Sequence, residues 1–283
     1  MSPDTLSVLL RALSFMAMLQ AAGIAVFVAV FSRHLVRADR EVRHFGAWSA
    51  AVALPLLSAQ FVLEAARMAD EFAGVVDLSL QRTAFASGAG AAFAARGGAL
   101  GLILFGLPRG GRAAQVTGCA GSVLVATSFA LMGHTAVHPD RWLLACALVC
   151  HVFVVGCWFG GMPALYLVTL REAPNLAARI VEAFSRLAIW AVPSLAIAGA
   201  LMSLVLVRRL AVFGEPYGWL LLAKIGAFAL LIGFGAANRL RLGPAVAHGA
   251  TRWFQRSLVA EYLLMLGVLA ATATMTSLYS PEP

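Results

Sequence analysis

The segment from residue 131 to residue 168 holds three histidines whose side chains are suited to bind a metal ion. His134 and His138 lie around a short polar turn, and His151 lies within an apolar run long enough to cross a bilayer. An ionisable side chain at that depth is costly and normally faces a partner or a polar cavity inside the protein. Because imidazole nitrogens suit copper or zinc, the pattern predicts one metal site or two successive ones.

Methionines are further candidate ligands, because thioether sulfur binds reduced copper. The candidates in the outer halves of the expected helices are Met132, Met202 and Met275. Plain packing is the alternative for each methionine, and a hydrogen bond to a neighbouring helix is the alternative for His151. We expect His134 near the outer interface and His151 up to about 10 Å deeper, since a helix rises about 1.5 Å per residue.

Three charged residues interrupt otherwise apolar runs. Arg96 and Lys224 are each the only base in their runs, and we expect both to face the bundle interior rather than lipid. Lys224 is either a side chain that snorkels to the interface, a counter-ion for a carboxylate such as Glu64, or an electrostatic gate on a cation path. For Glu261 we expect a structural ion pair.

The composition assigns the chain to polytopic membrane proteins, because 61% of its 283 residues are hydrophobic and only 12% are charged. Eight apolar runs have the length of a membrane span, so we predict an all-α bundle of eight transmembrane helices. The runs are 12–32, 44–63, 84–107, 113–139, 142–170, 187–207, 216–238 and 257–280. The amino-terminal segment lacks the order of a cleaved signal peptide, so we expect the first helix to stay in the membrane.

The sequence predicts two similar four-helix halves, residues 1–138 and residues 139–283. In each half a glycine precedes a base by six residues: Gly90 precedes Arg96, and Gly218 precedes Lys224. Since each half has an even number of helices, a duplication gives halves of the same orientation. Chance similarity between alanine- and leucine-rich helices is the alternative.

The net charge of +8 could suggest nucleic acid, but the placement of the bases indicates membrane topology instead. Of the 21 Lys and Arg residues, 13 lie in odd-numbered loops and six in even-numbered loops and the amino-terminal tail. By the positive-inside rule both termini then face outward, which is the periplasm in a Gram-negative cell. We therefore expect a multi-pass inner-membrane protein that does not bind nucleic acid and has His134 and His138 on its outer face.

Several short motifs make the second half resemble the copper-resistance D (CopD) family. The motifs are GHTA (133–136), His151 with WFGG (158–161), FSRLA (184–188), PYGWLLLAK (216–224), Asn238 with Arg239, and RSLVAEYLLML (256–266). They follow one another in the family's order. The segment RTAFASGAGAAFAAR (82–96) extends the resemblance into the first half.

The resemblance implies an inner-membrane protein of copper homeostasis and copper resistance, with a periplasmic copper carrier of the CopC type as its partner. We expect copper to enter through His134, pass to His151 and move inward, with His138 and the methionines assisting at the mouth. The sequence has no GxxxxGK[ST] motif for ATP. We therefore expect no enzymatic activity, and copper movement must be driven by a gradient or by a partner.

Two alternatives stay open at this point. A b-type cytochrome or a quinone-linked electron carrier would bind haem through transmembrane histidines, although His134 and His151 are expected at different depths. The other alternative is a platform on which a periplasmic copper chaperone docks without any transport.

The arginine asymmetry predicts that both termini face outward. A single cysteine introduced at Ser2 or Glu282 should react with a membrane-impermeant thiol reagent in intact cells, whereas a cysteine at Arg37, in the first arginine-rich loop, should stay protected. The four natural cysteines are first replaced by serine. Protection at both termini would overturn this topology and place His134 in the cytosol.

Overall fold

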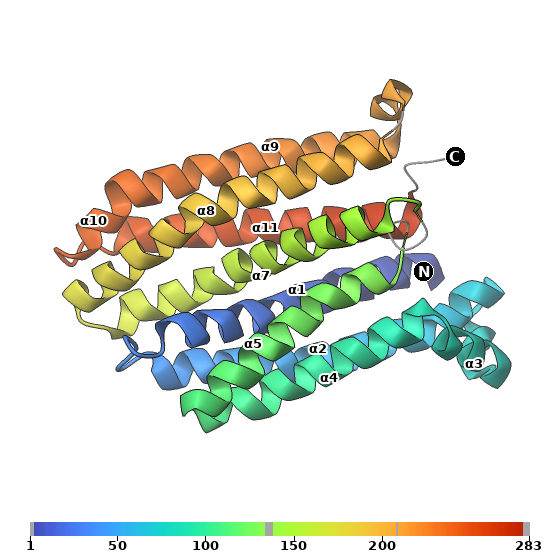
Figure 1. Ribbon diagram of the computed structural model, residues 1–283, viewed down its shortest axis with the longest axis horizontal. Coiled ribbons are helices and arrows are strands. Elements are labelled where there is room, and N and C mark those ends of the chain that lie inside the picture. The colour runs from blue at the N-terminus through green and yellow to red at the C-terminus, as the bar shows by residue number, and fades with distance from the viewer. Residues whose placement is uncertain (1–2, 134–137, 208, 280–283) are drawn as a thin grey trace.

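The computed structural model describes residues 3–133, 138–207 and 209–279 (Figure 1). In these residues the chain is helical and contains no strand, and eight of its helices are long and apolar enough to cross a membrane. The long helices are α1 (Pro3–Phe31), α2 (Asp39–Ala69), α4 (Gly88–Gly106), α5 (Gly111–Ser128), α7 (Arg141–Arg171), α8 (Pro174–Leu206), α9 (Pro216–Ala237) and α11 (Arg252–Leu278). The predicted polytopic helical bundle is confirmed.

Short helices connect the long ones. These are η1 (Phe72–Val76), α3 (Leu78–Ala86), η2 (Leu107–Arg109), η3 (Phe129–Leu131), η4 (Leu210–Gly214), the π-helical segment η5 (Asn238–Leu242) and α10 (Gly243–Val246). The long helices run roughly along one axis in Figure 1. We call the end where α1 begins and α11 finishes the terminal end, and the opposite end, with the 32–38 and 247–251 loops, the arginine-rich end.

Several helices have boundaries that differ from the predicted runs: α1 and α2 begin earlier, at Pro3 and Asp39, and α5 ends at Ser128 and not at residue 139. The sixth helix, α8, begins at Pro174 and not near residue 187, because Pro174 suits the first turn and the charged segment buries Ala177, Ile180 and Val181. The third predicted run is broken at Ser87. This residue is extended, and its hydroxyl accepts a hydrogen bond from the Ala89 N–H at 3.1 Å, which starts α4 as a new helix.

Helix α1 is the most buried of the eight long helices and occupies the centre of the bundle. It packs against α2, α4 and α5 of the first half and also against α7 and α11 of the second half. Helix α1 of the first predicted half is therefore packed against both predicted halves. The division at residue 138 stays a prediction.

Helices α1 and α7 cross with their backbones in contact. A Cβ atom added to Gly23 would lie 1.9 Å from the Gly156 carbonyl oxygen, and one added to Gly160 would lie 2.6 Å from the Gly23 backbone. Two small residues four positions apart let membrane helices approach closely, which increases their van der Waals contact. This crossing ties the first half to the second.

Glu172 makes a second connection between the halves at the arginine-rich end. One of its carboxylate oxygens accepts hydrogen bonds from the backbone N–H groups of Val36, Arg37 and Ala38 at 2.8, 2.8 and 2.9 Å. The loop between α1 and α2 thus wraps around the carboxylate that follows α7. Hydrogen bonds to a charged acceptor are among the stronger ones.

The repeated glycines of the two halves have the same structural role. Gly90 and Gly218 are each the third residue of a long helix, and each lies against the backbone of a preceding short helix. A Cβ atom would lie 1.9 Å from the Phe85 carbonyl oxygen at Gly90 and 2.1 Å from the Val212 carbonyl oxygen at Gly218. In both cases a short helix at the terminal end folds back onto the first turn.

Apolar side chains cover the outside of the bundle. Helices α8 and α9 are the least buried of the membrane spans, and on α8 the side chains of Trp190 and Leu204 are 80% and 79% exposed. Surfaces of this kind are compatible with lipid and not with water. The protein therefore lies in a bilayer.

The glycine crossing should be sensitive to a single methyl group. We expect Gly23→Ala and Gly160→Ala to lower the free energy of unfolding by about 1–3 kcal/mol, because the added atom must push two backbones apart. Gly101→Ala and Gly267→Ala are matched controls, since nothing lies within 4 Å of a Cβ atom at either helical position. Thermal unfolding in detergent measures the difference. Equal stability of the two pairs would contradict this packing.

Candidate metal site

His151 lies in α7, ten residues after Arg141 and about 15 Å along the helix from its terminal end. Its Nδ1 atom is buried and forms no hydrogen bond of normal length and angle. The Leu195 carbonyl of α8 lies beside the ring. The imidazole thus points into the protein between α7 and α8. A buried polar nitrogen without a partner is uncommon and calls for an explanation.

Gly199 makes room for this imidazole on α8. A Cβ atom at Gly199 would lie 3.4 Å from Cε1 of His151, so the ring packs directly on the α8 backbone. Met202 follows Gly199 by three residues and therefore shares its face, about 4.5 Å closer to the terminal end. Of the predicted thioether ligands, Met202 has the placement closest to His151 along the helix face.

The remaining predicted ligands lie at or near the terminal end. His134 falls outside the described residues, and Met132 lies two residues before it. The His138 side chain is only 9% exposed, unlike a fully solvated turn residue, and its Nδ1 accepts a hydrogen bond from the Asp140 N–H at 3.0 Å. Met275 packs in an apolar cluster with Val212 and Tyr217. In the described part of the chain no three His, Cys, Asp or Glu side chains come together as a metal cluster.

Lys224 of α9 is close enough to His151 for the two charges to interact. Within the described residues, no hydrogen bond or ion pair involves its ammonium group. The suggested counter-ion Glu64 is engaged elsewhere, because its carboxylate pairs with Arg67 at 3.3 Å. Lys224 thus places positive charge near the candidate metal ligand.

Arg96, the base that the predicted repeat pairs with Lys224, is 4% exposed. Its Nε donates to the Ser128 hydroxyl at 3.1 Å, and its guanidinium lies 4.6 Å from the centre of the Phe129 ring and 5.9 Å from that of Phe15. Aromatic faces attract a cation. Arg96 is thus enclosed and held by its neighbours.

Glu261 is 2% exposed and forms no ion pair with a described residue, contrary to the expected structural pair. It accepts a hydrogen bond from the Asn238 amide, and the Trp158 indole of α7 also faces its carboxyl group. On the next residue, the Tyr262 hydroxyl donates to Oε1 of Gln20 at 2.9 Å, and the Tyr262 ring stacks on Phe159 at 4.7 Å. The sequence analysis missed Gln20, although an amide in the middle of an apolar run was a usable signal.

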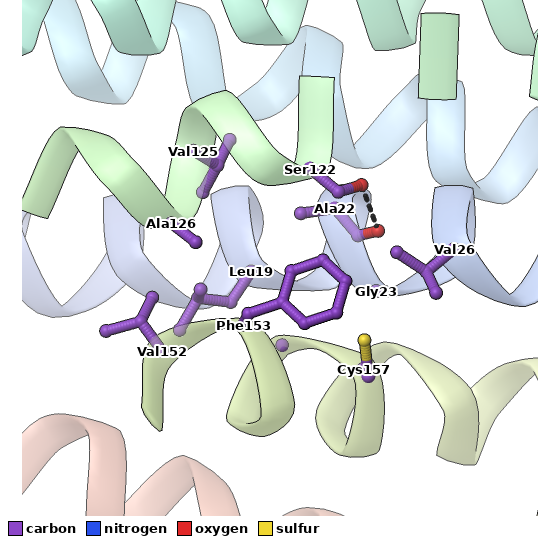
Figure 2. Close-up of a pocket in the computed structure, with 11 residues that line it drawn as sticks. Leu19, Ala22, Gly23, Val26, Ser122, Val125, Ala126, Val152, Phe153 and Cys157 are labelled. Atoms are coloured by element: carbon purple, nitrogen blue, oxygen red, sulfur yellow. Dashed lines mark hydrogen bonds between the residues drawn. The ribbon is translucent and has the colours of Figure 1, made fainter. Parts of the chain in front are cut away.

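A small pocket between α1, α5 and α7 lies apart from these groups (Figure 2). Its cavity volume is only about 10 Å³, and its lining is apolar except for Ser122 and Cys157. The Ser122 hydroxyl donates to the Ala22 carbonyl at 2.8 Å, as the dashed line in Figure 2 marks. Because His151 does not line it, this pocket is not the candidate metal site.

Comparison with known families accounts for most of the chain. Residues 178–275 match the family described as "Copper resistance protein D", and residues 1–142 match "Copper resistance protein D-like, N-terminal domain". The chain belongs to the copper resistance protein D family. No solved structure matches this member of the family.

Two relatives have names that refer to copper. "Copper transport protein CutJ" of Bacillus subtilis (strain 168) is 31% identical over 160 residues, which cover 54% of this chain and 29% of the relative. "Copper resistance protein D" of Pseudomonas syringae pv. tomato is 29% identical over 183 residues, which cover 57% of this chain and 57% of the relative. The chain therefore spans only part of the curated relatives it matches, and it is a copper-related membrane protein.

Lys224 should influence copper without being needed for folding. Because its ammonium opposes a cation at His151, we expect Lys224→Met to raise the apparent copper affinity by about tenfold, which corresponds to about 1.4 kcal/mol. Tighter binding should slow release and reduce copper transfer. Arg209→Met, in the exposed pair with Glu215 at 3.5 Å, is the control. Protein level, copper affinity by titration and the rate of copper transfer are measured for each variant. A loss of Lys224→Met protein would indicate that the ammonium neutralises a buried acidic group instead.

Proposed function

We propose that this protein moves copper ions inward across the inner membrane and thereby supports copper homeostasis and copper resistance. Copper arrives at the terminal end, is captured by His134 with help from His138 and Met132, and passes to His151. The observation that carries the proposal is the buried, unpartnered Nδ1 of His151 in a protein of this family. The Leu195 carbonyl beside the ring can only accept an N–H hydrogen, so the lone pair of one imidazole nitrogen stays available to a metal ion.

His151 is suited to a temporary stop on a path. An ion must bind firmly enough to enter and weakly enough to leave again. His151, assisted by the Met202 thioether one turn nearer the terminal end, offers one nitrogen and one soft sulfur. Met275, packed in its apolar cluster, has a packing role that competes with ligation.

The orientation of the protein follows from charge, and the resemblance to the family implies the partner and the inward direction. The arginine-rich end faces the cytoplasm under the positive-inside rule, so the terminal end faces the periplasm. A periplasmic copper carrier of the CopC type would deliver its ion to that end. Since the chain contains no ATP-binding motif, the energy comes from a gradient or from the partner, and no enzymatic step is involved.

The haem alternative is less compatible with the arrangement of histidines. Haem ligation between helices needs two histidines at similar depth on facing helices. In the described helices the other histidine is the exposed His44, near the arginine-rich end of α2, which lies far from the depth of His151. The names of the relatives refer to copper.

Replacement of His151 tests the proposal directly. We expect His151→Leu to leave protein level unchanged, because it removes an unsatisfied buried polar group. Copper uptake into proteoliposomes of known orientation should fall by about tenfold or more, as after loss of a metal ligand or its support. His134→Ala should weaken apparent copper affinity more than His138→Ala does. His44→Leu is the matched control.

The outcomes separate the three functions. Normal copper uptake by the His151→Leu protein at normal expression would make His151 a structural hydrogen-bonding residue. Copper binding without uptake, together with copper tolerance that needs the periplasmic carrier, would indicate a docking platform. A haem absorption band in the purified protein would indicate the electron carrier.

A further inference from the structure

A buried carboxyl group without a counter-ion lies in the same half of the protein as His151. Glu261 is 2% exposed and nine residues into α11, about 14 Å from the arginine-rich end. Within the described residues no Lys, Arg or His lies within 4 Å of its oxygens. An ionised carboxylate is very costly in such surroundings, whereas a protonated one is not.

The charged and titratable groups near Glu261 point away from it or are otherwise engaged. Arg256 of α11 lies over the Trp253 ring at 4.9 Å, and Arg239 donates to the Ser185 carbonyl of α8 at 3.1 Å. Tyr262 gives its hydroxyl hydrogen to Gln20 of α1. The groups that face the carboxyl from α7 and from η5 are Trp158 and Asn238, and neither titrates.

Asn238 can serve both protonation states of this carboxyl group. It donates from its amide nitrogen to Oε1 of Glu261, and its own Oδ1 is buried without a partner. An amide has N–H hydrogens that donate and an oxygen that accepts hydrogen bonds. Its N–H can therefore donate to an ionised carboxylate. After the amide rotates, its oxygen can accept the O–H of a carboxylic acid. Gln20 likewise has an unpartnered nitrogen, and the Ser257 hydroxyl of α11 also faces the Glu261 carboxyl group.

The backbone at Asn238 is of a kind that often occurs at functional sites. Asn238 is the first residue of the π-helical segment η5, which follows α9 directly. Such segments loosen the regular helical hydrogen-bond pattern and are frequent where a helix has a functional role. A change in the hydrogen bond between Asn238 and Glu261 would therefore occur where the helix changes from α-helical to π-helical geometry.

The Glu261 carboxyl group is also connected to the candidate copper ligand. Trp158, which faces the carboxyl, lies seven residues after His151 on the same face of α7 and about 10 Å further along it. The neighbouring Phe159 stacks on Tyr262. A shift of α11 against α7 would therefore act on the helix that carries His151.

We propose that Glu261 is a proton-binding site, and that its carboxyl group takes up and releases one proton in each copper-transport cycle. The carboxylate binds a proton from one side of the membrane and becomes a carboxylic acid. The Asn238 amide then rotates, so that its oxygen accepts from the acid in place of its N–H donating to the carboxylate. The proton finally leaves to the other side. The coupling ion is then H⁺. The coupling of the proton to copper rests on the proposed copper transport, whereas proton binding by Glu261 does not.

Infrared difference spectroscopy of the copper-free protein in lipid tests the proton site by itself. Stepping the pH should reveal a carboxylic-acid carbonyl band that shifts in D₂O. The band should be lost in Glu261→Gln and retained in Glu182→Gln, which replaces an exposed carboxylate of α8. Absence of any such band in the wild-type protein, or a band that persists in folded Glu261→Gln protein, would overturn the proposal.

Proteoliposomes with an imposed pH gradient test the coupling. Copper flux of the wild-type protein should respond to the gradient, and an ionophore that removes the gradient should abolish the response. Glu261→Gln should lose the response while it still binds Cu⁺, and Glu182→Gln should keep it. If Glu261 binds and releases a proton but copper flux does not respond to the pH gradient, proton coupling is overturned. Absence of copper flux in every protein would contradict the proposed function, and the infrared band alone would then decide whether Glu261 binds a proton.

Discussion

The close contact between the α1 and α7 backbones is the constraint on which the rest of the structure depends. Gly23 lies against Gly156 and Gly160 at distances that leave no room for a methyl group. Since lipid provides no hydrophobic force between membrane helices, their association depends on close packing of this kind. Helix α1 also packs on α2, α5 and α11, so the crossing fixes a five-helix centre.

This centre explains where the candidate site lies. His151 is carried by α7, which is fixed against α1, but its imidazole faces α8, which packs mainly on α7 and α10. Helices α8 and α9 are the least buried spans, and elements with few buried contacts are those that move at low cost. The candidate copper ligand thus lies between a fixed helix and a lightly packed one, as alternating access to a site requires.

Much of the fold followed from hydrophobicity, because each membrane span must satisfy its own backbone hydrogen bonds. Eight spans and the buried position of Arg96 were predictable on that basis. The glycine crossing was not, since Gly156 and Gly160 become meaningful only once Gly23 lies opposite them. The helical start of α8 was missed because its charged first turns are stabilised by three buried apolar residues and not by overall hydropathy. The ion pair expected for Glu261 was wrong because an uncharged amide, Asn238 at the π-helical end of α9, lies against its carboxyl group.

The two related bases show how one scaffold position serves different purposes. Arg96 and Lys224 each follow, by six residues, a glycine that lies against a short helix, so the backbone places them alike. Arg96 is held by Ser128 and by two phenylalanine rings, which fixes its charge in the first half. Lys224 forms no hydrogen bond or ion pair with a described residue, and it lies close enough to His151 for their charges to interact. A positive charge that is fixed excludes cations permanently, whereas one on a flexible stem can withdraw. Under the proposed copper transport, this asymmetry is compatible with a copper path in the second half, next to His151.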